Sequence, residues 1–264
     1  MKKYFNDGIT LIKKVIYAKR GEPFKVGNKT LHFTPGTRPT KFKYVNSVDI
    51  TVRNDVKQMK YFIDNVKPGC LVLDIGGHVG QYAVLFSALV NEAGKVITFE
   101  PDDTARKILY QNLKLNDFTD NVLVESVALS NSNGTHSFFS RGGDSMSSLV
   151  RSGLGSNASL GDVQEHSVVT MRLDDYLLAK DLGYPDWIKL DTEGAEINIL
   201  KGAQDVLKQK TIIICELHPY AWNEFGTNYN ELLSIINQSG RKMRYLDESL
   251  SLDSGPHYGT VIIS

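Results

Sequence analysis

The sequence predicts an α/β protein whose core is a doubly wound, mostly parallel sheet of the Rossmann-like kind. Three observations support this prediction. From residue 56 onward, short apolar stretches of strand length alternate with stretches of helical period. The first such strand runs into a glycine-rich turn and then a helix, as in many nucleotide-binding proteins. Two final strand-like stretches, residues 241–247 and 259–264, predict an antiparallel hairpin at one edge of the sheet.

The central strands are short apolar runs bounded by turn residues. They are apolar on both faces, as expected of parallel strands that helices cover on each side. Five are expected, at residues 70–76, 95–101, 122–130, 186–191 and 211–219. Because helical stretches separate them, the crossovers between the strands should be right-handed.

The helices follow from apolar residues that recur every three or four positions. Met59, Phe62, Ile63 and Val66 form one such face, and the turn at Pro68 ends that helix. Further helices are expected at residues 82–90, 104–115, 193–207 and 229–240.

Residues 131–165 interrupt this alternation and are rich in Gly, Ser and Asn. Strand-like stretches flank them at residues 135–139 and 166–173, so the segment is either a flexible linker or a hairpin with a long loop. Because the alternation resumes afterwards, we favour an insertion near residues 131–170 over a domain boundary.

The first part of the chain lacks this regular pattern. Residues 1–55 are expected to form an N-terminal extension or cap, followed by one domain at residues 56–264. β-like pieces occur at residues 29–35 and 47–53. The stretch 8–20 is amphipathic, and a surface helix packed on the domain is favoured over a helix that lies on a membrane.

The composition indicates which classes of partner and which cellular compartment to expect. The chain has 264 residues, and thirty basic residues balance thirty acidic ones, which argues against nucleic acid or an anionic membrane as a partner. No apolar run approaches the about 20 residues of a membrane helix. Cys70 and Cys215 lie in apolar strand-like runs and are expected to be free thiols, as in the cytoplasm. None of these features predicts the oligomeric state.

The turn after the first central strand differs from the dinucleotide-binding motif. That motif is G-x-G-x-x-G, but Ile75 stands at the first glycine position, before Gly77 and Gly80. The spacing therefore speaks against a dinucleotide-dependent dehydrogenase. Asp74 stands two places before Gly76, and its carboxylate would repel a pyrophosphate but attract a cationic ligand, such as the amino end and sulfonium of S-adenosylmethionine. The glycines let the backbone pass close to that ligand.

Glu100 ends the second central strand at the same edge of the sheet. A carboxylate in this place can accept hydrogen bonds from the hydroxyls of a ribose. Each acidic residue also has a purely structural explanation, because Asp74 can cap the turn and Glu100 can be a solvated strand end. Together, at the carboxyl ends of neighbouring strands, they predict a nucleoside site.

Six stretches between residues 68 and 219 form a specific combination: PGCLVLDIGGHVGQY, VITFEPD, VALSNSNG, TMRLDDYL, IKLDTEGAEINILKGA and ICELHP. This combination resembles the FkbM-family methyltransferases, which use S-adenosylmethionine. The resemblance implies a class I methyltransferase fold, for which a terminal hairpin is typical, and methylation of an oxygen on a sugar or natural-product hydroxyl. It departs at His78, where the family more often has Asn. We expect the cofactor to be bound by Asp74, Gly76, Gly77, His78, Gly80, Glu100, Pro101, Ser126 and Val127.

A second group of ionisable residues ends the fourth and fifth strands. Asp191 closes the fourth strand, and alternation places Glu216 and His218 on one face at the end of the fifth. The carboxyl ends of these strands meet at the same crevice. Glu193 suits the positive end of the helix that follows, and His218 has an alternative explanation as a structural histidine.

The chemistry explains why such a group is wanted. An alcohol is about as weakly acidic as water, whose pKa is ~15.7, so it needs a base or a metal to become a good nucleophile. We expect His218, paired with Asp191, to be the base, and activity to rise with pH as the neutral imidazole appears. The alternative is Mg²⁺ held by Asp191 and Glu216. Zinc is not expected, because the sequence has no C-x-x-C or H-E-x-x-H motif.

These features together predict a cytoplasmic S-adenosylmethionine-dependent O-methyltransferase acting on a hydroxyl, most readily that of a sugar or glycan precursor. The alternatives are methylation of a non-sugar metabolite and a nucleotide-binding module without catalysis. We expect Glu193 to contact the acceptor, and the Gly/Ser-rich residues 141–162 to form a lid that reaches it through Arg141 or Ser148.

Overall fold

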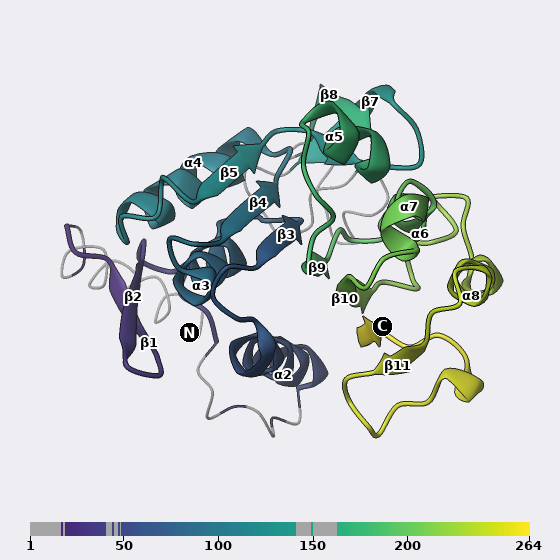
Figure 1. Cartoon of the computed structure of the whole chain (residues 1–264), viewed down its shortest axis with the longest axis horizontal. Helices are drawn as coiled ribbons and strands as arrows, with labels where there is room; N and C mark the ends of the chain where they lie inside the picture. Colours follow the sequence, from purple (N-terminus) through teal and green to yellow (C-terminus); the bar gives the residue numbers. More distant parts are fainter. Residues whose placement is uncertain are drawn as a thin grey trace.

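The computed structural model describes residues 19–40, 49–140 and 163–264, together with Tyr17, Tyr44, Ser47 and Leu149. At the centre of the molecule lies a seven-stranded sheet in the order β11-β12-β10-β9-β3-β4-β5 (Figure 1). Its strands are β3 (Leu71–Ile75), β4 (Lys95–Phe99), β5 (Val122–Glu125), β9 (Trp187–Leu190), β10 (Ile212–Leu217), β11 (Met243–Tyr245) and β12 (Gly259–Ile263). Five strands are parallel, and β12 is antiparallel to both β10 and β11. The predicted doubly wound sheet with a terminal antiparallel hairpin is confirmed.

Helices cover both faces of this sheet (Figure 1). They are α2 (Ile50–Asn65), α3 (Gln81–Val90), α4 (Asp103–Lys114), α5 (Leu173–Ala179), α6 (Glu196–Lys201), α7 (Gln204–Leu207) and α8 (Tyr229–Gln238). Helices α2, α3 and α4 bury their apolar sides in one core, while α5 to α8 bury theirs in the other.

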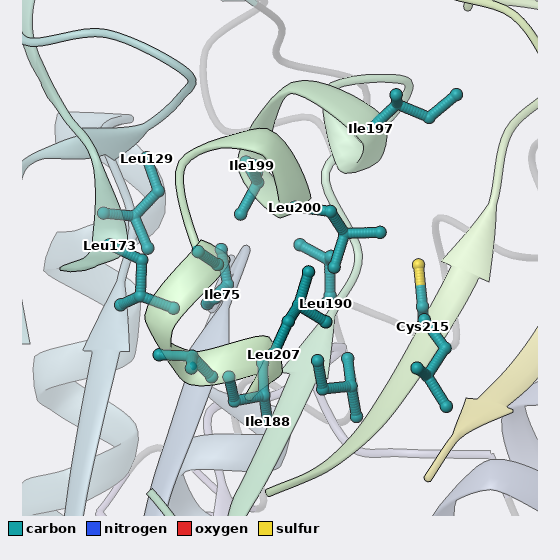
Figure 2. Packing of buried hydrophobic residues seen from close by; sticks show 14 of the residues in the cluster. Ile75, Leu129, Leu173, Ile188, Leu190, Ile197, Ile199, Leu200, Leu207 and Cys215 are labelled. Carbon is teal, nitrogen blue, oxygen red and sulfur yellow. The ribbon is translucent and has the colours of Figure 1, made fainter. Parts of the chain in front are cut away.

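Alternation along the strands divides the apolar side chains between the two cores. In β3, Val72 belongs to the core under α3, whereas Leu73 and Ile75 belong to the core under α6. Figure 2 shows this second core, where Leu200 of α6 lies above Leu190 of β9. Removing so much apolar surface from water provides the main drive for folding.

The N-terminal part contributes a small hairpin and the first helix of the sheet domain. Strands β1 (Glu22–Val26) and β2 (Lys29–Phe33) pair antiparallel, which confirms the β-like piece at residues 29–35. The β-like piece expected at residues 47–53 is wrong, because α2 already begins at Ile50. The side chain of Asp49 caps that helix by accepting hydrogen bonds from the backbone of Thr51 and Val52.

The segment that interrupts the alternation of strands and helices forms a separate, smaller sheet. Strands β6 (Ala128–Leu129), β7 (Gly134–Ser140) and β8 (Gln164–Met171) form it in the order β6-β8-β7, with β7 and β8 antiparallel. The hairpin alternative for this segment is therefore confirmed. The single strand expected at residues 122–130 is wrong, because β5 ends in the large sheet and β6 joins the small one. The expected lid at residues 141–162 lies outside the described residues, Leu149 excepted.

The helix expected at residues 193–207 is divided in two. Gly202 separates α6 from α7 and packs so closely that a Cβ there would lie 2.2 Å from the carbonyl oxygen of Ser130. Its own carbonyl accepts a hydrogen bond from the backbone of Asp174. Because this contact fixes the chain at Gly202, one continuous helix cannot form.

The strand order places a crevice between β3 and β9. From β3 the chain first continues to β4 on one side and only later to β9 on the other. At such a switch point the crossovers leave the sheet on opposite faces, which opens a binding crevice beyond the carboxyl ends of the two strands.

Two further features of the described residues bear on the sequence predictions. Cys70 and Cys215 are both free, as expected. In the part of the chain that the structure covers, no helix combines the length and the apolar character that crossing a bilayer requires.

Candidate functional site

The turn after β3 packs tightly between the ends of β4 and β9. Gly76 has a φ of 84°, and a Cβ there would lie 1.8 Å from the carbonyl oxygen of Asp191. A Cβ on Gly77 would lie 2.0 Å from Oγ1 of Thr98. The backbone N–H groups of both glycines donate to the carbonyl of Phe99 at 3.0 Å. Only glycine fits these two positions, so the turn is held firmly at the mouth of the crevice.

His78 follows in the same turn with a φ of 44°. Asn, Asp and His enter this region of backbone space more often than other side chains do. A His and an Asn therefore suit this position for the same conformational reason. The backbone N–H of His78 donates to Oε2 of Glu100 at 2.7 Å, which ties the turn to the end of β4.

A first cavity of about 140 Å³ opens at the carboxyl ends of β3 and β4. Its walls are mostly apolar, and they include Ile75, Phe99, Val127, Leu129, Phe138 and Ile199. Its floor is the backbone of the glycine turn, and Glu100 supplies a carboxylate at one side. A mostly apolar pocket with a few oriented polar groups is the usual form of a small-ligand site, here one that suits a nucleoside.

Glu100 is held in place by the backbone on both sides. Its Oε1 accepts from the N–H of Asp102, and its Oε2 accepts from the N–H of His78, each at 2.7 Å. The side chain is only 6% exposed, and burial raises the pKa of Glu100 to about 7. Each oxygen keeps a second lone pair, so the carboxylate can still accept hydrogen bonds from a ligand in the cavity.

Most residues expected to bind the cofactor lie at this cavity or beside it. Gly76, His78, Glu100, Pro101 and Val127 line the first cavity, and Gly77 lines the second cavity described below. Two others are elsewhere among the described residues. Gly80 precedes α3 and faces Leu109, and Ser126 is exposed and lines neither cavity.

Asp74 requires a correction. Its side chain is fully buried beneath the turn, and among the described residues it lines neither cavity, so its carboxylate does not meet a ligand directly. Thr98 donates to its Oδ2 at 3.2 Å, and Nζ of Lys189 lies 3.6 Å from its Oδ1. Burial raises the pKa of Asp74 to about 6, against the opposing charge of Lys189. The residue stabilises the turn and the lysine from below.

Lys189 is a buried cation between the two halves of the site. Although only 2% exposed, its Nζ lies 3.1 Å from Oδ2 of Asp191 and donates to the carbonyl of Gly76 at 3.3 Å. The ammonium also lies 4.9 Å from the centre of the Tyr82 ring. Burial by itself would lower the pKa of Lys189, but Asp191 and Asp74 outweigh burial and raise it. The lysine is therefore charged at neutral pH and orients Asp191.

A second cavity, of about 340 Å³, adjoins the first at four shared residues: Gly76, His78, Asp191 and Glu193. Its lining is strongly polar. The acidic and basic groups that face it include Asp55, Lys189, Asp191, Glu193, Glu216 and His218. All three residues expected to be catalytic, Asp191, Glu216 and His218, line this cavity.

His218 is a buried side chain of the second cavity that a carboxylate behind it holds in place. It is 2% exposed, and its Nδ1 lies 2.9 Å from Oε1 of Glu196. Its Nε2 lies 3.7 Å from Oε2 of Glu193 and 3.9 Å from Oδ1 of Asp191. The imidazole thus has one nitrogen in a hydrogen bond and the other directed at two carboxylates.

The carboxylates around His218 favour its protonated form, which differs from the neutral imidazole expected from the sequence. Burial would lower the pKa of His218, but Glu196, Asp191 and Glu193 raise it to about 10. The direction agrees with the expected effect of a neighbouring carboxylate. A neutral imidazole at neutral pH is nevertheless wrong for the ligand-free site, because three carboxylates surround the ring instead of one.

Glu216 is turned away from this group. Its Oε1 accepts a short hydrogen bond from the hydroxyl of Tyr258, a residue just before β12. Burial, reinforced by the charge of Asp191, raises the pKa of Glu216 to about 8. Glu216 and Asp191 face the same cavity from different sides.

One group among the described residues has the geometry to hold a metal ion. Asp191, Glu193 and His218 each offer one atom, and these atoms all lie within 4.8 Å of one another. Glu216 does not belong to this group, so nothing in the group supports the expected Mg²⁺ alternative at Asp191 and Glu216.

Of the three residues expected to contact the acceptor, the structure describes one. Glu193 lines both cavities and accepts a hydrogen bond from the hydroxyl of Tyr220 at 2.8 Å. Its φ of 52° places it in the left-handed region. Arg141 and Ser148 lie outside the described residues.

Four residues of the site were not found from the sequence: Asp55, Lys189, Glu196 and Tyr258. Lys189 had a signal, because a lysine inside the apolar run WIKL must be paired if that strand is buried. In the sequence Glu196 indicates only an acidic residue near a helix start, which the helix dipole favours, although its carboxylate accepts from His218, Trp222 and Gly194. Asp55 and Tyr258 reach the site from segments outside the recognisable motifs.

Two characterised proteins are similar in sequence. One is the hexuronic acid methyltransferase AglP of Haloferax volcanii, 23% identical over 167 residues, which cover 63% of this chain and 64% of that protein. The other is the 2-O-methyltransferase NoeI of Sinorhizobium fredii, 30% identical over 159 residues, which cover 57% of this chain and 64% of that protein. The chain thus spans slightly less than two thirds of the length of these relatives.

Solved structures with a similar fold are more distant. The FkbM methyltransferase of Methylobacillus flagellatus has a TM-score of 0.46 and 15% identity, covering 84% of this chain and 57% of that one. Fibrillarin of Aeropyrum pernix, solved with S-adenosyl-L-methionine, has a TM-score of 0.42 and 11% identity, covering 75% of this chain and 67% of that one. The family model of the methyltransferase FkbM domain matches residues 74–245, well over half of the chain, and the protein therefore belongs to the FkbM methyltransferase family.

Proposed function

We propose that this methyltransferase transfers a methyl group from S-adenosylmethionine to a hydroxyl of a sugar or glycan precursor. The family supports methyl transfer. Two relatives, named for a hexuronic acid and for 2-O-methylation, support an oxygen of a saccharide as the acceptor atom.

A single arrangement carries this proposal. A mostly apolar cavity with one buried carboxylate adjoins a second, polar cavity, and Asp191 and Glu193 lie where the two meet. A nucleoside suits the first cavity, with Glu100 accepting from the ribose hydroxyls. Its reactive end would then lie at the shared wall, facing an acceptor in the second cavity.

The residues present fit the cofactor on structural grounds. The backbone at Gly76 and Gly77 approaches closely because no side chain can stand there. Glu100 is fixed by two backbone hydrogen bonds, so its free lone pairs point in a constant direction. S-adenosylmethionine, when bound, supplies an electrophilic methyl group on a positively charged sulfur.

The second cavity has the chemistry that a saccharide needs. Thr40, Thr51, Asp55 and Tyr258 line it beside the carboxylates, so many hydrogen-bond acceptors converge on one space. A sugar presents several hydroxyl donors, and each buried acceptor that finds one is satisfied. An apolar metabolite would leave these groups unpaired, at a cost of about 1–3 kcal/mol for each.

The reaction balances without another reactant. Methyl transfer would break the carbon–sulfur bond of the donor and leave its electron pair on a neutral thioether sulfur. A lone pair of the acceptor oxygen would form the new carbon–oxygen bond, and the hydroxyl proton needs an acceptor. Because His218 is already protonated in the ligand-free site, we assign that role to the carboxylate of Asp191, which lines the second cavity beside His218.

Calorimetry with Glu100→Ala tests the cofactor site. We expect the affinity for S-adenosylmethionine to fall at least tenfold, or ~1.4 kcal/mol, because the ribose hydroxyls lose their acceptor. Glu125→Ala is the matched control, since Glu125 ends the neighbouring strand but, among the described residues, is not part of either cavity wall. Binding of NAD⁺ in place of S-adenosylmethionine would overturn the proposal.

Mass spectrometry tests the acceptor class. The protein is incubated with S-adenosylmethionine and a panel of neutral hexoses, hexuronic acids and non-sugar alcohols. We expect a methylated product among the saccharides. If methylation occurs only on non-sugar alcohols, the acceptor class is wrong, and if the cofactor binds but no alcohol reacts, the protein is a binding module.

A further inference from the structure

We propose that Asp191, Glu193 and His218 bind a divalent transition-metal cation at the edge of the second cavity. The bound cation would hold the hydroxyl group of the acceptor. Mn²⁺ is the ion used to test the site. The binding site stands on geometry alone. Its part in hydroxyl activation rests on the proposed function.

The three ligand atoms come from the end of β9, the turn that follows it and the end of β10. Oδ1 of Asp191 follows β9, Oε2 of Glu193 comes two residues later, and Nε2 of His218 follows β10. Nε2 lies 3.7 Å and 3.9 Å from the two oxygens. A cation about 2.1 Å from each ligand needs those ligands about 3.0–3.6 Å apart. The three atoms lie within 4.8 Å of one another, so binding a cation requires the side chains to draw closer together.

The imidazole is directed at this point by a contact outside the cavity. Glu196 is fully buried and accepts from Nδ1 of His218 at 2.9 Å, so Nδ1 carries the hydrogen and Nε2 faces the two carboxylates. Histidines that bind metals typically donate their second N–H to a carboxylate in this way. Trp222 and Gly194 complete the hydrogen bonds of Glu196, at 3.0 Å and 2.8 Å, so its carboxylate cannot turn elsewhere.

Nε2 faces the second cavity with room for a ligand. The side chain of His218 is buried, and Nε2 has no hydrogen-bond partner among the described residues. Its contacts are the two long ion pairs with Asp191 and Glu193. A metal ion between the three atoms would replace these long contacts with direct bonds.

The ammonium group of Lys189 does not occupy the proposed metal position. Nζ of Lys189 lies on the Oδ2 side of Asp191, at 3.1 Å. Oδ1 is the oxygen that faces His218. Asp191 can therefore keep its ion pair with Lys189 and still offer one oxygen to a metal, with Glu193 supplying a second negative charge.

The donor set favours one class of metal. Imidazole with two carboxylates suits Mn²⁺, Fe²⁺ or Zn²⁺ better than Mg²⁺, which prefers oxygen ligands alone. Three protein ligands leave coordination positions open. An acceptor hydroxyl bound at one of them would become more acidic and could lose its proton to water in the cavity.

Metal binding is measured first, with the full chain and without cofactor or acceptor. Titration with Mn²⁺, followed by the electron paramagnetic resonance signal of the free ion, should show one bound ion per chain. Glu193→Gln should weaken binding at least tenfold, because a charged ligand is lost. Glu216→Gln is the matched control, since Glu216 faces the same cavity outside the three ligands, and it should change the affinity less than about twofold. Glu196→Gln should weaken binding roughly 10–100-fold, the usual effect of a group that orients a ligand.

Two results overturn the site: no bound Mn²⁺, or equal losses in Glu193→Gln and Glu216→Gln. Thermal unfolding of each variant shows whether it is folded. Methyl transfer is then assayed after EDTA treatment. Full activity without metal overturns the catalytic part, whereas loss on chelation and recovery with Mn²⁺ supports it. Because the Mn²⁺ titration needs neither S-adenosylmethionine nor a sugar, its failure leaves the proposed function intact, and failure of cofactor binding leaves the metal site intact.

Discussion

Lys189 shows how single residues determine this site. A lone ammonium inside a protein is strongly destabilising, and this one is tolerated because Asp74 and Asp191 flank it. The pairing has a structural result, because it turns one oxygen of Asp191 away from the cavity and leaves the other facing His218. The residue therefore positions others and need not touch a substrate.

A substitution at Gly76 tests whether the tight packing of a single residue stabilises the turn. Gly76→Ala should destabilise the protein by at least about 2 kcal/mol more than Gly69→Ala. Both glycines have a similar positive φ, 84° and 87°, so each alanine suffers the same backbone strain of about 1–2 kcal/mol. Only at Gly76 would the new Cβ meet a neighbour, the carbonyl of Asp191, whereas at Gly69 nothing lies within 4 Å.

Urea unfolding of the two glycine variants measures this difference. The affinity for S-adenosylmethionine should fall in Gly76→Ala and stay unchanged in Gly69→Ala. Equal stabilities would show that the turn can shift away from β9, and the tight approach would then have no importance for the site.

The sequence predicted which strand ends carry the site, but not the direction of every side chain. Glu100, Asp191, Glu216 and His218 all reach a cavity, because polar residues at the carboxyl ends of parallel strands gather at one edge. Asp74 does not, since its side chain points below the turn, toward Thr98 and Lys189. Its partner Lys189 is 115 residues away in the chain, so nothing close to Asp74 in the sequence indicates this direction.

At the scale of elements, α2 joins the N-terminal part of the chain to the site. Its apolar side packs in the core with α3, and Asp55 on another side lines the second cavity. Arg53 and Lys57 of the same helix pair with Asp247 at 3.0 Å and 3.2 Å. Asp247 thus fastens the helix that forms one wall of the proposed acceptor site.

Asp247→Asn should destabilise the protein at neutral pH by about 1–3 kcal/mol. Burial would raise the pKa of Asp247, but hydrogen bonds from Ser249 and the charge of Lys57 lower it to about 2. A lowered pKa stabilises the fold above the ordinary value of 3.8, and that stabilisation is lost as pH falls toward 2. The difference between wild type and variant should therefore shrink to roughly half at about pH 3.

Denaturant unfolding between about pH 3 and pH 7 measures this trend. Asp64→Asn is the control on the same helix, because its pair with Lys60 is largely exposed and should contribute less than about 1 kcal/mol at any pH. A difference for Asp247→Asn that stays constant with pH would exclude the ionised carboxylate as its cause.

Element types were easier to predict from the sequence than element limits. From residue 56 onward, the strands and the helix faces follow from local apolar periodicity and agree with the structure, whereas the β-like piece expected at residues 47–53 is part of a helix. Two errors came from contacts with distant segments. Residues 122–130 divide between two sheets, because β6 pairs with β8 some forty residues later. The helix at residues 193–207 is broken at Gly202, because Ser130 packs against it.

For the molecule as a whole, the site joins both cores. The turn at Gly76 follows β3, whose side chains reach both clusters, and Asp191 follows β9, which also contributes to both. A ligand across β3 and β9 therefore contacts the ends of strands that anchor the entire sheet. Binding should be linked to global unfolding and not only to local order.

S-adenosylhomocysteine at 100 times its dissociation constant should raise the free energy of unfolding by about 2.7 kcal/mol. For a chain of this size the melting temperature should then rise by roughly 5–10 °C. Differential scanning calorimetry measures the shift, with Glu100→Ala at the same ligand concentration as the control. A shift that Glu100→Ala does not reduce would place the ligand somewhere other than the first cavity.

The two cavities are lined by different segments of the chain, and this difference has a consequence for acceptor preference. Every described residue of the first cavity lies within residues 74–245, the part that the family model matches. The second cavity also takes Thr40, Thr51, Asp55 and Tyr258 from the flanking segments. Under the proposed function, donor recognition depends on the shared domain alone, while acceptor preference depends also on residues outside it. Substitutions in those flanking segments should therefore change the acceptor and leave the donor site intact.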